Sequence, residues 1–210
     1  MRSRITEFIL LNLARKITGA YALWHGCAPE SRQRIYYANH SSHGDLLLIW
    51  ASLPPALRKE TRPVAGADYW QKNAFRRFIA NKVFRAVLIE RGGASRYYNP
   101  VQDMSAALTG GSSLIIFPEG TRNTTSQLLL PFKTGLFRLA AAHPHVEIIP
   151  VWLENPHRVM PKGECLPVPL LCSVHFGSPL HLAEGEKRHE FLMRAAETLK
   201  ALVPPSHQSA

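Results

Sequence analysis

The sequence feature that most constrains the fold is an alternation of short apolar runs with segments of helical periodicity. Runs of β-branched and aromatic residues predict strands at residues 34–39, 63–67, 86–90, 113–117, 146–153 and 170–176. One helical pattern begins at residue 46, and further helical patterns cover residues 69–80, 101–108, 134–142 and 186–202. This alternation predicts an α/β fold, a single domain with a largely parallel mixed sheet flanked by helices. Because such sheets bind ligands at the carboxyl ends of their strands, we expect the functional residues there.

The N-terminal segment has the pattern of a helix that lies in a membrane surface. Its apolar residues recur at steps of three and four, namely Ile5, Phe8, Ile9, Leu13, Ile17, Ala20, Tyr21 and Trp24, and Arg2, Arg4, Arg15 and Lys16 flank them. A helix packed against the core would show the same periodicity, so both interpretations stay open. We expect residues 1–24 to form an interfacial helical segment and residues 25–210 to form the folded domain.

Charge, hydropathy and cysteine content limit the partners and the cellular compartment that we expect for this protein. Lys and Arg number 25 against 15 Asp and Glu, a net charge of +10, which predicts an anionic partner: nucleic acid, an anionic membrane or a phosphorylated substrate. No stretch provides the roughly 20 apolar residues of a membrane span. Arg15 and Lys16 interrupt the N-terminal apolar run, so we expect no export. Cys27, Cys165 and Cys172 are odd in number and widely spaced, which favours free thiols facing the cytosol.

The first polar strand end is the segment Asn-His-Ser-Ser-His-Gly-Asp at residues 39–45. If Ser42 caps the following helix, Asp45 lies in its first turn, and its carboxylate can hold the His40 imidazole as a general base. Ser42 and Asp45 also fit a plain capping box. A metal site built from His40, His43 and Asp45 lacks further ligands, so we expect no metal.

The second polar strand end is Phe-Pro-Glu-Gly-Thr-Arg-Asn at residues 117–123. Gly120 permits a tight turn, Thr121 offers a hydroxyl, and the fork of Arg122 matches a phosphate. An ordinary surface turn with a solvated arginine explains the same residues. Two further strand ends carry Arg91 and Pro150, and the proline requires an edge, a bulge or an irregular end.

In this order the four strand ends resemble those of the glycerolipid acyltransferases, which convert lysophosphatidic acid to phosphatidic acid, and of their lysophospholipid relatives. The similar blocks are H-x₄-D at residues 40–45, the Ile-Glu-Arg end of the second block at 89–91, F-P-E-G-T-R at 117–122 and Ile-Pro-Val at 149–151. Further similarity lies at residues 130–135 and 176–180, so the resemblance covers roughly residues 15–180. The first and third blocks together make the pattern highly specific.

The resemblance implies a glycerol-3-phosphate acyltransferase-like fold and a direct transfer without an acyl-enzyme. His40 would be the general base for the sn-2 hydroxyl of 1-acylglycerol 3-phosphate, and Asp45 would orient it. The donor would be the thioester of acyl-CoA or acyl-carrier protein, with no further cofactor. The residues implied to bind the acceptor phosphate are Arg91, Glu119, Gly120, Thr121 and Arg122, with Pro150 shaping the pocket near the donor. Glu119 is expected to orient an arginine or accept a hydroxyl, since a carboxylate does not attract phosphate.

Three departures from the family pattern leave the acceptor open. Arg85 stands near the position of the usual glycine of the second block, Leu88 stands in place of a common phenylalanine, and Asn123 replaces a serine. A lyso-ornithine lipid or another lysophospholipid is an alternative acceptor, and an acyl-thioester hydrolase is an alternative activity. A nucleic-acid module lacks a recognised motif, and a catalytically inactive lipid-binding protein does not explain the intact His40 and Asp45.

A cluster of cations and aromatic residues follows the second predicted strand. Lys72, Arg76, Arg77, Lys82 and Arg85 interleave with Trp70, Phe75, Phe78 and Phe84. Together with residues 1–24 they predict a membrane-facing platform, although an ordinary solvated helix face gives the same pattern. We expect a peripheral protein on the cytoplasmic face of the inner (plasma) membrane, bound to its anionic surface.

Overall fold

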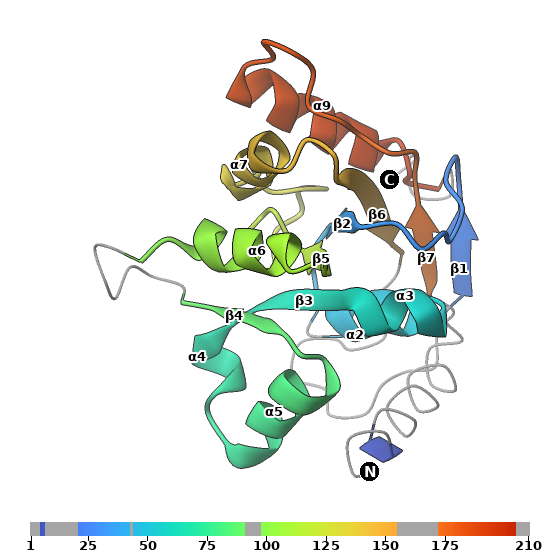
Figure 1. Cartoon of the computed structure of the whole chain (residues 1–210). Coiled ribbons are helices and arrows are strands. Elements are labelled where there is room, and N and C mark those ends of the chain that lie inside the picture. The colour runs from blue at the N-terminus through green and yellow to red at the C-terminus, as the bar shows by residue number, and fades with distance from the viewer. Residues whose placement is uncertain (1–4, 7–20, 43, 91–97, 155–171, 205–210) are drawn as a thin grey trace.

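A seven-stranded sheet in the order β1-β7-β6-β2-β5-β3-β4 forms the centre of the computed structural model, which describes residues 5–6, 21–42, 44–90, 98–154 and 172–204 (Figure 1). The strands are β1 (Tyr21–Trp24), β2 (Arg34–Ala38), β3 (Thr61–Gly66), β4 (Val87–Ile89), β5 (Ser113–Ile116), β6 (Glu147–Leu153) and β7 (Ser173–Phe176). Neighbouring strands are parallel except β6 and β7. The prediction of a largely parallel mixed sheet is confirmed.

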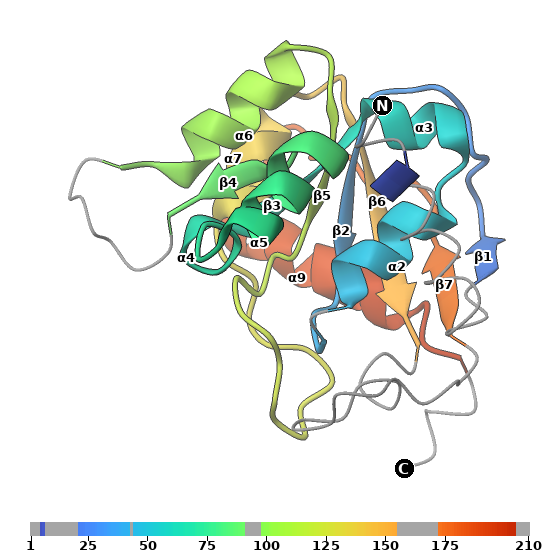
Figure 2. The same cartoon turned by 90° about the horizontal axis from the view of Figure 1, so that it is seen from below.

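Helices cover both faces of the sheet. They are α2 (Asp45–Ser52), α3 (Pro55–Glu60), α4 (Ala67–Trp70), α5 (Ala74–Phe78), the π-helical turn η1 (Ile79–Val83), α6 (Pro100–Thr109), α7 (Gly135–Ala142) and α9 (Arg188–Lys200). One core lies beneath α6, α7 and α9, and the other lies beneath α2, α3 and η1 (Figures 1 and 2). Central strand β2 is buried on both faces, since Ile35 and Tyr37 enter one core and Tyr36 and Ala38 enter the other.

Local hydrogen bonding explains two differences from the predicted helices. The helix predicted at residues 69–80 is divided into α4, α5 and η1, because the Asn73 side chain accepts the N–H of Arg76 at 2.8 Å and starts a new helix. Helix α3 is not among the predicted helices, because proline commonly ends a helical pattern, and Pro54 and Pro55 follow the pattern that begins at residue 46. Proline is also favoured at the first turn of a helix, and Pro55 begins α3.

The start of the described chain differs from the predicted N-terminal helix. Tyr21–Trp24 form strand β1, which pairs with β7 in parallel, so the prediction that the helix extends to Trp24 is wrong. Trp24 stacks on Phe176 with ring centroids 4.0 Å apart, a contact that the extended backbone makes possible. Most of the predicted interfacial segment, residues 1–4 and 7–20, lies outside the described residues. Among the described helices, none is long and apolar enough to cross a bilayer.

Pro150 lies in an interior strand, at an irregular pairing. It faces Tyr37 of β2, so the interpretation of this segment as an edge strand is wrong. On the β7 side, Val151 pairs with Phe176 but Ile148 pairs with Leu180, so the facing chain contains one extra residue. Because the pairing is interrupted at this bulge, the ladder does not need the backbone N–H that proline lacks. Gly177 permits the contact, because a Cβ there would lie 2.8 Å from Cγ of Pro150.

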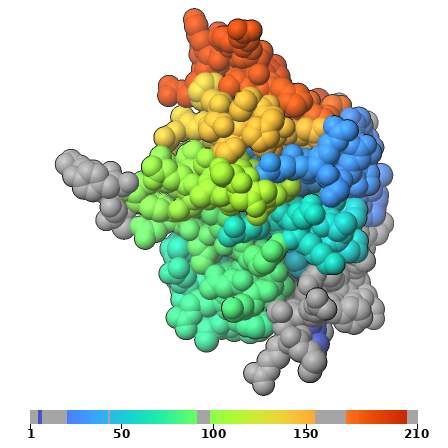
Figure 3. Space-filling view, viewed as in Figure 1, coloured from blue at the N-terminus to red at the C-terminus, as the bar shows by residue number. Residues whose placement is uncertain are grey.

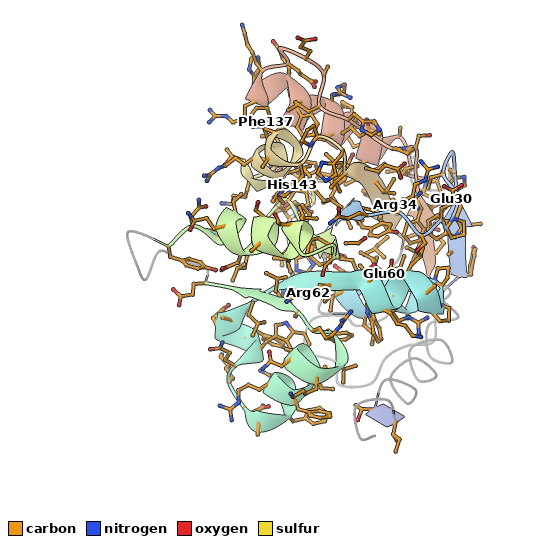
Figure 4. The ribbon with its side chains drawn as sticks, viewed as in Figure 1. Glu30, Arg34, Glu60, Arg62, Phe137 and His143 are labelled. Atoms are coloured by element: carbon orange, nitrogen blue, oxygen red, sulfur yellow. The ribbon has the colours of Figure 1, made fainter. Side chains whose placement is uncertain are left out.

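A buried ion pair closes the amino end of β2 and β6. The Arg34 side chain, labelled in Figure 4, is 2% exposed. Its Nε donates to Glu147 Oε2 at 2.8 Å. Arg34 also donates to the carbonyl of Ala28 at 2.7 Å, and Arg32 adds a second contact to Glu147 at 3.1 Å. Burial raises the pKa of the Glu147 carboxyl, but the hydrogen bonds and charges of Arg34 and Arg32 outweigh it and hold that pKa below its usual range.

The variant Glu147→Gln is expected to destabilise the fold by about 2 kcal/mol at neutral pH, because it leaves a buried arginine without its counter-charge. Since the native pKa of Glu147 is lowered, its contribution is fully present above the unfolded value of about 4.3 and is lost as the pH falls through the native value. Urea unfolding of both proteins should therefore show a difference that shrinks from pH 6 towards about pH 3. A difference independent of pH would contradict this assignment.

Candidate active site

A side-chain clasp holds the carboxyl ends of β2 and β6 together. The Asn39 amide donates from Nδ2 to the carbonyl of Leu153 at 3.1 Å, and its Oδ1 accepts the N–H of Leu153 at 2.8 Å. Asn39 is buried and follows directly after β2, so its side chain replaces the next backbone pairing of the ladder. The backbone is thereby free to turn at His40 while the sheet stays closed.

His40 and Asp45 meet in the turn between β2 and α2. His40 Nδ1 and Asp45 Oδ2 lie 2.8 Å apart, and the same oxygen accepts the backbone N–H groups of Ser41 at 2.7 Å and Ser42 at 2.8 Å. The Asp45 side chain is fully buried, whereas that of His40 is 17% exposed. The predicted pairing of His40 with Asp45 is therefore present, and the imidazole Nδ1 donates to the carboxylate.

The start of α2 differs in detail from the expected cap. The N-cap is Gly44, without a side-chain cap hydrogen bond, and the prediction that Ser42 caps the helix is wrong. Ser42 Oγ instead accepts the N–H of Gly44 at 3.1 Å, which tightens the turn before the helix. Asp45 lies in the first turn of α2 as predicted, where the helix dipole favours a carboxylate.

One face of the imidazole is covered and one nitrogen is open. The ring of Phe117, at the end of β5, stacks on His40 with centroids 4.1 Å apart and an interplanar angle of 20°. The stack and the Asp45 contact together fix the ring orientation. Within the described part of the chain, His40 Nε2 makes no hydrogen bond. Geometry therefore leaves this nitrogen available to take a proton from a bound hydroxyl.

Glu119 joins the loops that follow β2 and β5. Its Oε1 accepts the backbone N–H of His40 and its Oε2 accepts that of Leu130, both at 2.8 Å. The adjacent backbone adds a further bond, from the N–H of Asn123 to the carbonyl of His40 at 2.6 Å. Burial raises the pKa of Glu119, partly offset by the hydrogen bonds from Leu130 and His40. Both carboxylate oxygens thus bind backbone donors rather than the arginine or hydroxyl that we expected.

Gly120 forms the tight turn after β5. Its φ of +71° lies in the left-handed region, and its N–H donates to the carbonyl of Phe117 at 3.0 Å. The Lys133 side chain packs over it, with Cγ and Cε each 3.2 Å from the position of a Cβ. The backbone N–H of Lys133 also donates to the carbonyl of Pro118 at 2.7 Å. A larger residue at position 120 would therefore meet both strain and a steric contact.

The other predicted binding residues divide into three groups. Thr121 and Arg122 are exposed at the turn beside His40, and within the described residues Arg122 makes no ion pair. Arg91 lies outside the described residues, although β4 ends at the same edge of the sheet as β2. Pro150 lies inside the sheet opposite Tyr37 rather than at the edge with His40. The structure therefore brings together His40, Asp45, Glu119 and the turn at residues 120–122.

The described cysteines are protonated thiols. Cys27 and Cys172 are free, as predicted, while Cys165 lies outside the described residues. Burial, with the negative charges of Asp45 and Glu154, raises the pKa of Cys172 to about 11, and burial also raises the pKa of Cys27. Because the thiolate is the reactive form, neither thiol is suited to carry an acyl group near neutral pH.

Sequence reasoning missed the residues that position His40 through its backbone or its ring face. The role of Asn39 could have been predicted, because a side-chain amide directly after a strand can continue the hydrogen bonding to the neighbouring strand. Phe117 was interpreted as the end of a strand and the start of the F-P-E-G-T-R block, and Leu130 as part of a further similar block, without a contact to His40 in either case. Their contacts to the histidine depend on the folded path of the loop after β5, which no local pattern specifies.

Comparison with known proteins places this geometry in a family. The model of the Acyltransferase family matches residues 25–154, which include His40, Asp45 and the segment 117–122. The chain belongs to the acyltransferase family.

Among curated relatives of this acyltransferase are three proteins named 1-acyl-sn-glycerol-3-phosphate acyltransferase. The one from Cocos nucifera is 28% identical over 84% of this chain and 58% of its own length, and the one from Limnanthes douglasii is 26% identical over 81% and 61%. The one from Haemophilus influenzae is 30% identical over 59% and 48%. The chain thus spans about half to three fifths of these relatives.

The fold also matches a solved structure, the 1-acyl-sn-glycerophosphate acyltransferase PlsC from Thermotoga maritima. The TM-score is 0.71 at 20% identity, and the match covers 100% of this chain and 86% of the other. The agreement confirms the predicted fold class for this acyltransferase: a mixed α/β domain with a seven-stranded sheet flanked by helices.

Glu119→Gln is expected to destabilise the acyltransferase by about 1–3 kcal/mol, because the NH₂ group of glutamine would face one of the two backbone donors and leave it unpaired. Urea unfolding measures this difference. Glu184→Gln is the matched control, since Glu184 is exposed and its replacement should change stability by less than about 0.5 kcal/mol. Equal stabilities of the two variants would show that the Glu119 contacts contribute nothing.

Proposed function

We propose that the chain transfers an acyl group to the sn-2 hydroxyl of 1-acylglycerol 3-phosphate and so makes phosphatidic acid. One observation carries the proposal: the His40 imidazole, fixed by buried Asp45, presents its open Nε2 beside the turn that bears Arg122. The names of the curated relatives support this acceptor. The chain's family and the arrangement of these residues agree with the same chemistry.

The reaction uses His40 twice. Nε2 accepts the proton of the sn-2 hydroxyl as its oxygen attacks the carbonyl carbon of the donor thioester. The tetrahedral intermediate then breaks its C–S bond, and the leaving thiolate takes the proton from the imidazolium. Asp45 holds the tautomer and stabilises the imidazolium between the two transfers. Acyl-CoA or acyl-carrier protein serves as the donor, and no further cofactor is needed.

Arg122 is proposed to bind the acceptor phosphate, together with Arg91, Thr121 and the backbone at Gly120. Arg122 is exposed, and the next residue, Asn123, is bonded to the His40 carbonyl, which keeps the arginine close to the base. A guanidinium fork matches a phosphate in charge and shape. The reaction is proposed to take place at the cytoplasmic face of the inner membrane, with the part of the predicted interfacial segment that precedes β1 lying in the membrane surface.

Acceptor dependence of thioester cleavage tests the proposed activity. The full-length protein should release CoA from acyl-CoA only when 1-acylglycerol 3-phosphate is supplied, and mass spectrometry should detect phosphatidic acid. His40→Ala should lower the rate by about 10²–10⁴-fold or more without changing the circular dichroism spectrum. His189→Ala, at a histidine whose side chain is 67% exposed, is the matched control and should retain activity. Equal CoA release with and without acceptor would instead identify a hydrolase.

Arg122→Ala should raise the KM for 1-acylglycerol 3-phosphate by about tenfold or more, since hydrogen bonds to a charged group contribute about 1.5–3 kcal/mol. The KM for the acyl donor should stay unchanged. Steady-state kinetics measures both constants, with Arg138→Ala on α7 as the control for loss of an exposed arginine. An unchanged acceptor KM would exclude the phosphate role, and a panel of other lysolipids would then show which head group is used.

A further inference from the structure

The aromatic residues after β3 divide into core residues and one exposed ring. Trp70, Phe78 and Phe84 pack against the core beneath α2, and the Trp70 and Phe84 rings lie 5.9 Å apart between centroids. Phe75 instead projects from α5 and is 69% exposed, more than any other large apolar side chain in the described residues. These three rings, buried at Phe84 and partly buried at Trp70 and Phe78, attach this segment to the core and do not account for the exposure of Phe75.

Five cations lie close to Phe75 in the sequence. Lys72, Arg76, Arg77, Lys82 and Arg85 lie between residues 69 and 89, a stretch that contains no Asp or Glu. Arg76 is half-buried and stacks over Tyr69 at 4.2 Å, and the other four are exposed. Across the described chain, none of the five forms an ion pair. We call Phe75 and these five residues the basic platform.

The backbone at Arg85 is strained, and its carbonyl accepts a hydrogen bond from Nε of Arg62 at 2.7 Å. The φ of Arg85 is +50°, in the left-handed region where glycine is favoured and where a residue with a Cβ costs about 1 kcal/mol. The resembling family commonly has glycine near this position, so the conformation explains the glycine. This chain keeps a cation there despite the strain, and such strain is usually retained where a side chain is needed.

The basic platform lies on the same face of the sheet as α2, the helix that begins at Asp45. Figure 2, seen from below, shows α2 and α5 on the side of the sheet that faces the viewer. In Figure 3 the blue-green to green segment that carries α4 and α5 occupies the lower part of the molecule, while α9, in red, lies at the top. The opposite face, covered by α7 and α9, therefore offers a control surface.

We propose that the basic platform binds the anionic surface of a lipid bilayer, with Phe75 inserted among the acyl chains. Cations without ion-pair partners, carried with one exposed aromatic ring by α5 and its neighbouring segments, match the charge and layering of such a surface. The inference rests on the proposed function, because a lipid acceptor would reach the site from the bilayer. A nucleic acid would use the same cations but gives no reason for an inserted side chain.

Vesicle co-sedimentation of the full-length protein tests the proposal. Binding should require phosphatidylglycerol in phosphatidylcholine vesicles and should weaken with salt. The double variant Lys72→Glu with Arg77→Glu should lower the partition coefficient by about 25-fold or more, because each cation near an anionic surface contributes about fivefold. Phe75→Ala should lower it by about tenfold through lost apolar burial, with little dependence on salt.

Matched variants on the opposite face control for charge and hydrophobicity. Arg138→Glu with Arg188→Glu makes the same change in net charge on α7 and α9, and Met193→Ala removes a side chain that is 60% exposed. Both should bind vesicles as the wild type does. Losses equal to those of the platform variants would overturn the proposal, because they would indicate a response to overall charge or hydrophobicity.

Arg85→Gly separates membrane binding from folding. Glycine relieves the left-handed strain, so the variant should have an unchanged or higher Tm and yet bind anionic vesicles about fivefold more weakly. A destabilised variant could lose binding through local unfolding, and this one removes that explanation. Unchanged partitioning of both Arg85→Gly and the Lys72/Arg77 variant would overturn the proposal.

Assays without vesicles distinguish this proposal from the proposed activity. With monomeric short-chain 1-acylglycerol 3-phosphate, the platform variants should retain the kcat of the wild type. A wild type that binds vesicles through the platform but makes no phosphatidic acid would refute the activity and not the surface. If the protein bound duplex oligonucleotides tightly but did not bind vesicles, and the platform variants abolished that binding, the ligand of the platform would be a nucleic acid and not a membrane.

Discussion

The site depends on one buried oxygen, Oδ2 of Asp45. It accepts hydrogen bonds from the His40 ring and from the backbone N–H groups of Ser41 and Ser42, and the side chain is fully buried. A buried carboxylate is costly unless it is paired and hydrogen-bonded. Three donors and the start of α2 compensate for burial at Oδ2, whereas Oδ1 is buried without a hydrogen-bond partner among the described residues. The same oxygen therefore shapes the turn after β2 and orients the His40 imidazole. These two features cannot vary independently.

A second carboxylate completes this arrangement from the neighbouring strand. Because β5 pairs directly with β2, the loop after β5 passes beside the turn at His40, and Glu119 spans both loops through backbone donors. Asp45 thus fixes the imidazole while Glu119 fixes the backbone that carries it. Phe117 adds the third constraint by stacking on the ring. The His40 side chain is thus fixed through its ring nitrogen and its ring face, and its main chain is fixed by Glu119.

Hydrophobic periodicity and the Gly and Pro residues at the ends of elements predicted the order of strands and helices well, because both signals depend on residues within a few positions of one another. The pairing of His40 with Asp45 was also predictable, since both lie in one short turn before an apolar helix. The strand character of Tyr21–Trp24 was not, because it depends on pairing with β7, about 150 residues away. Likewise the role of Glu119 depends on donors from two loops, so its charge suggested a partner side chain where the fold supplies backbone. Pro150 was assigned an irregular pairing correctly, but its interior position follows only from the strand order.

The Asn39 clasp has a consequence for how this strand end tolerates change. A single planar amide supplies one donor and one acceptor to Leu153, so it imitates a peptide group at the point where the main chain leaves the sheet. Neither a carboxylate nor an alkyl group of similar shape offers that pair. Position 39 is thus restricted by the need for one donor and one acceptor in the same side chain rather than by the size of that side chain. Two neighbouring residues therefore meet separate demands: asparagine maintains the pairing of the sheet, and histidine serves the proposed reaction.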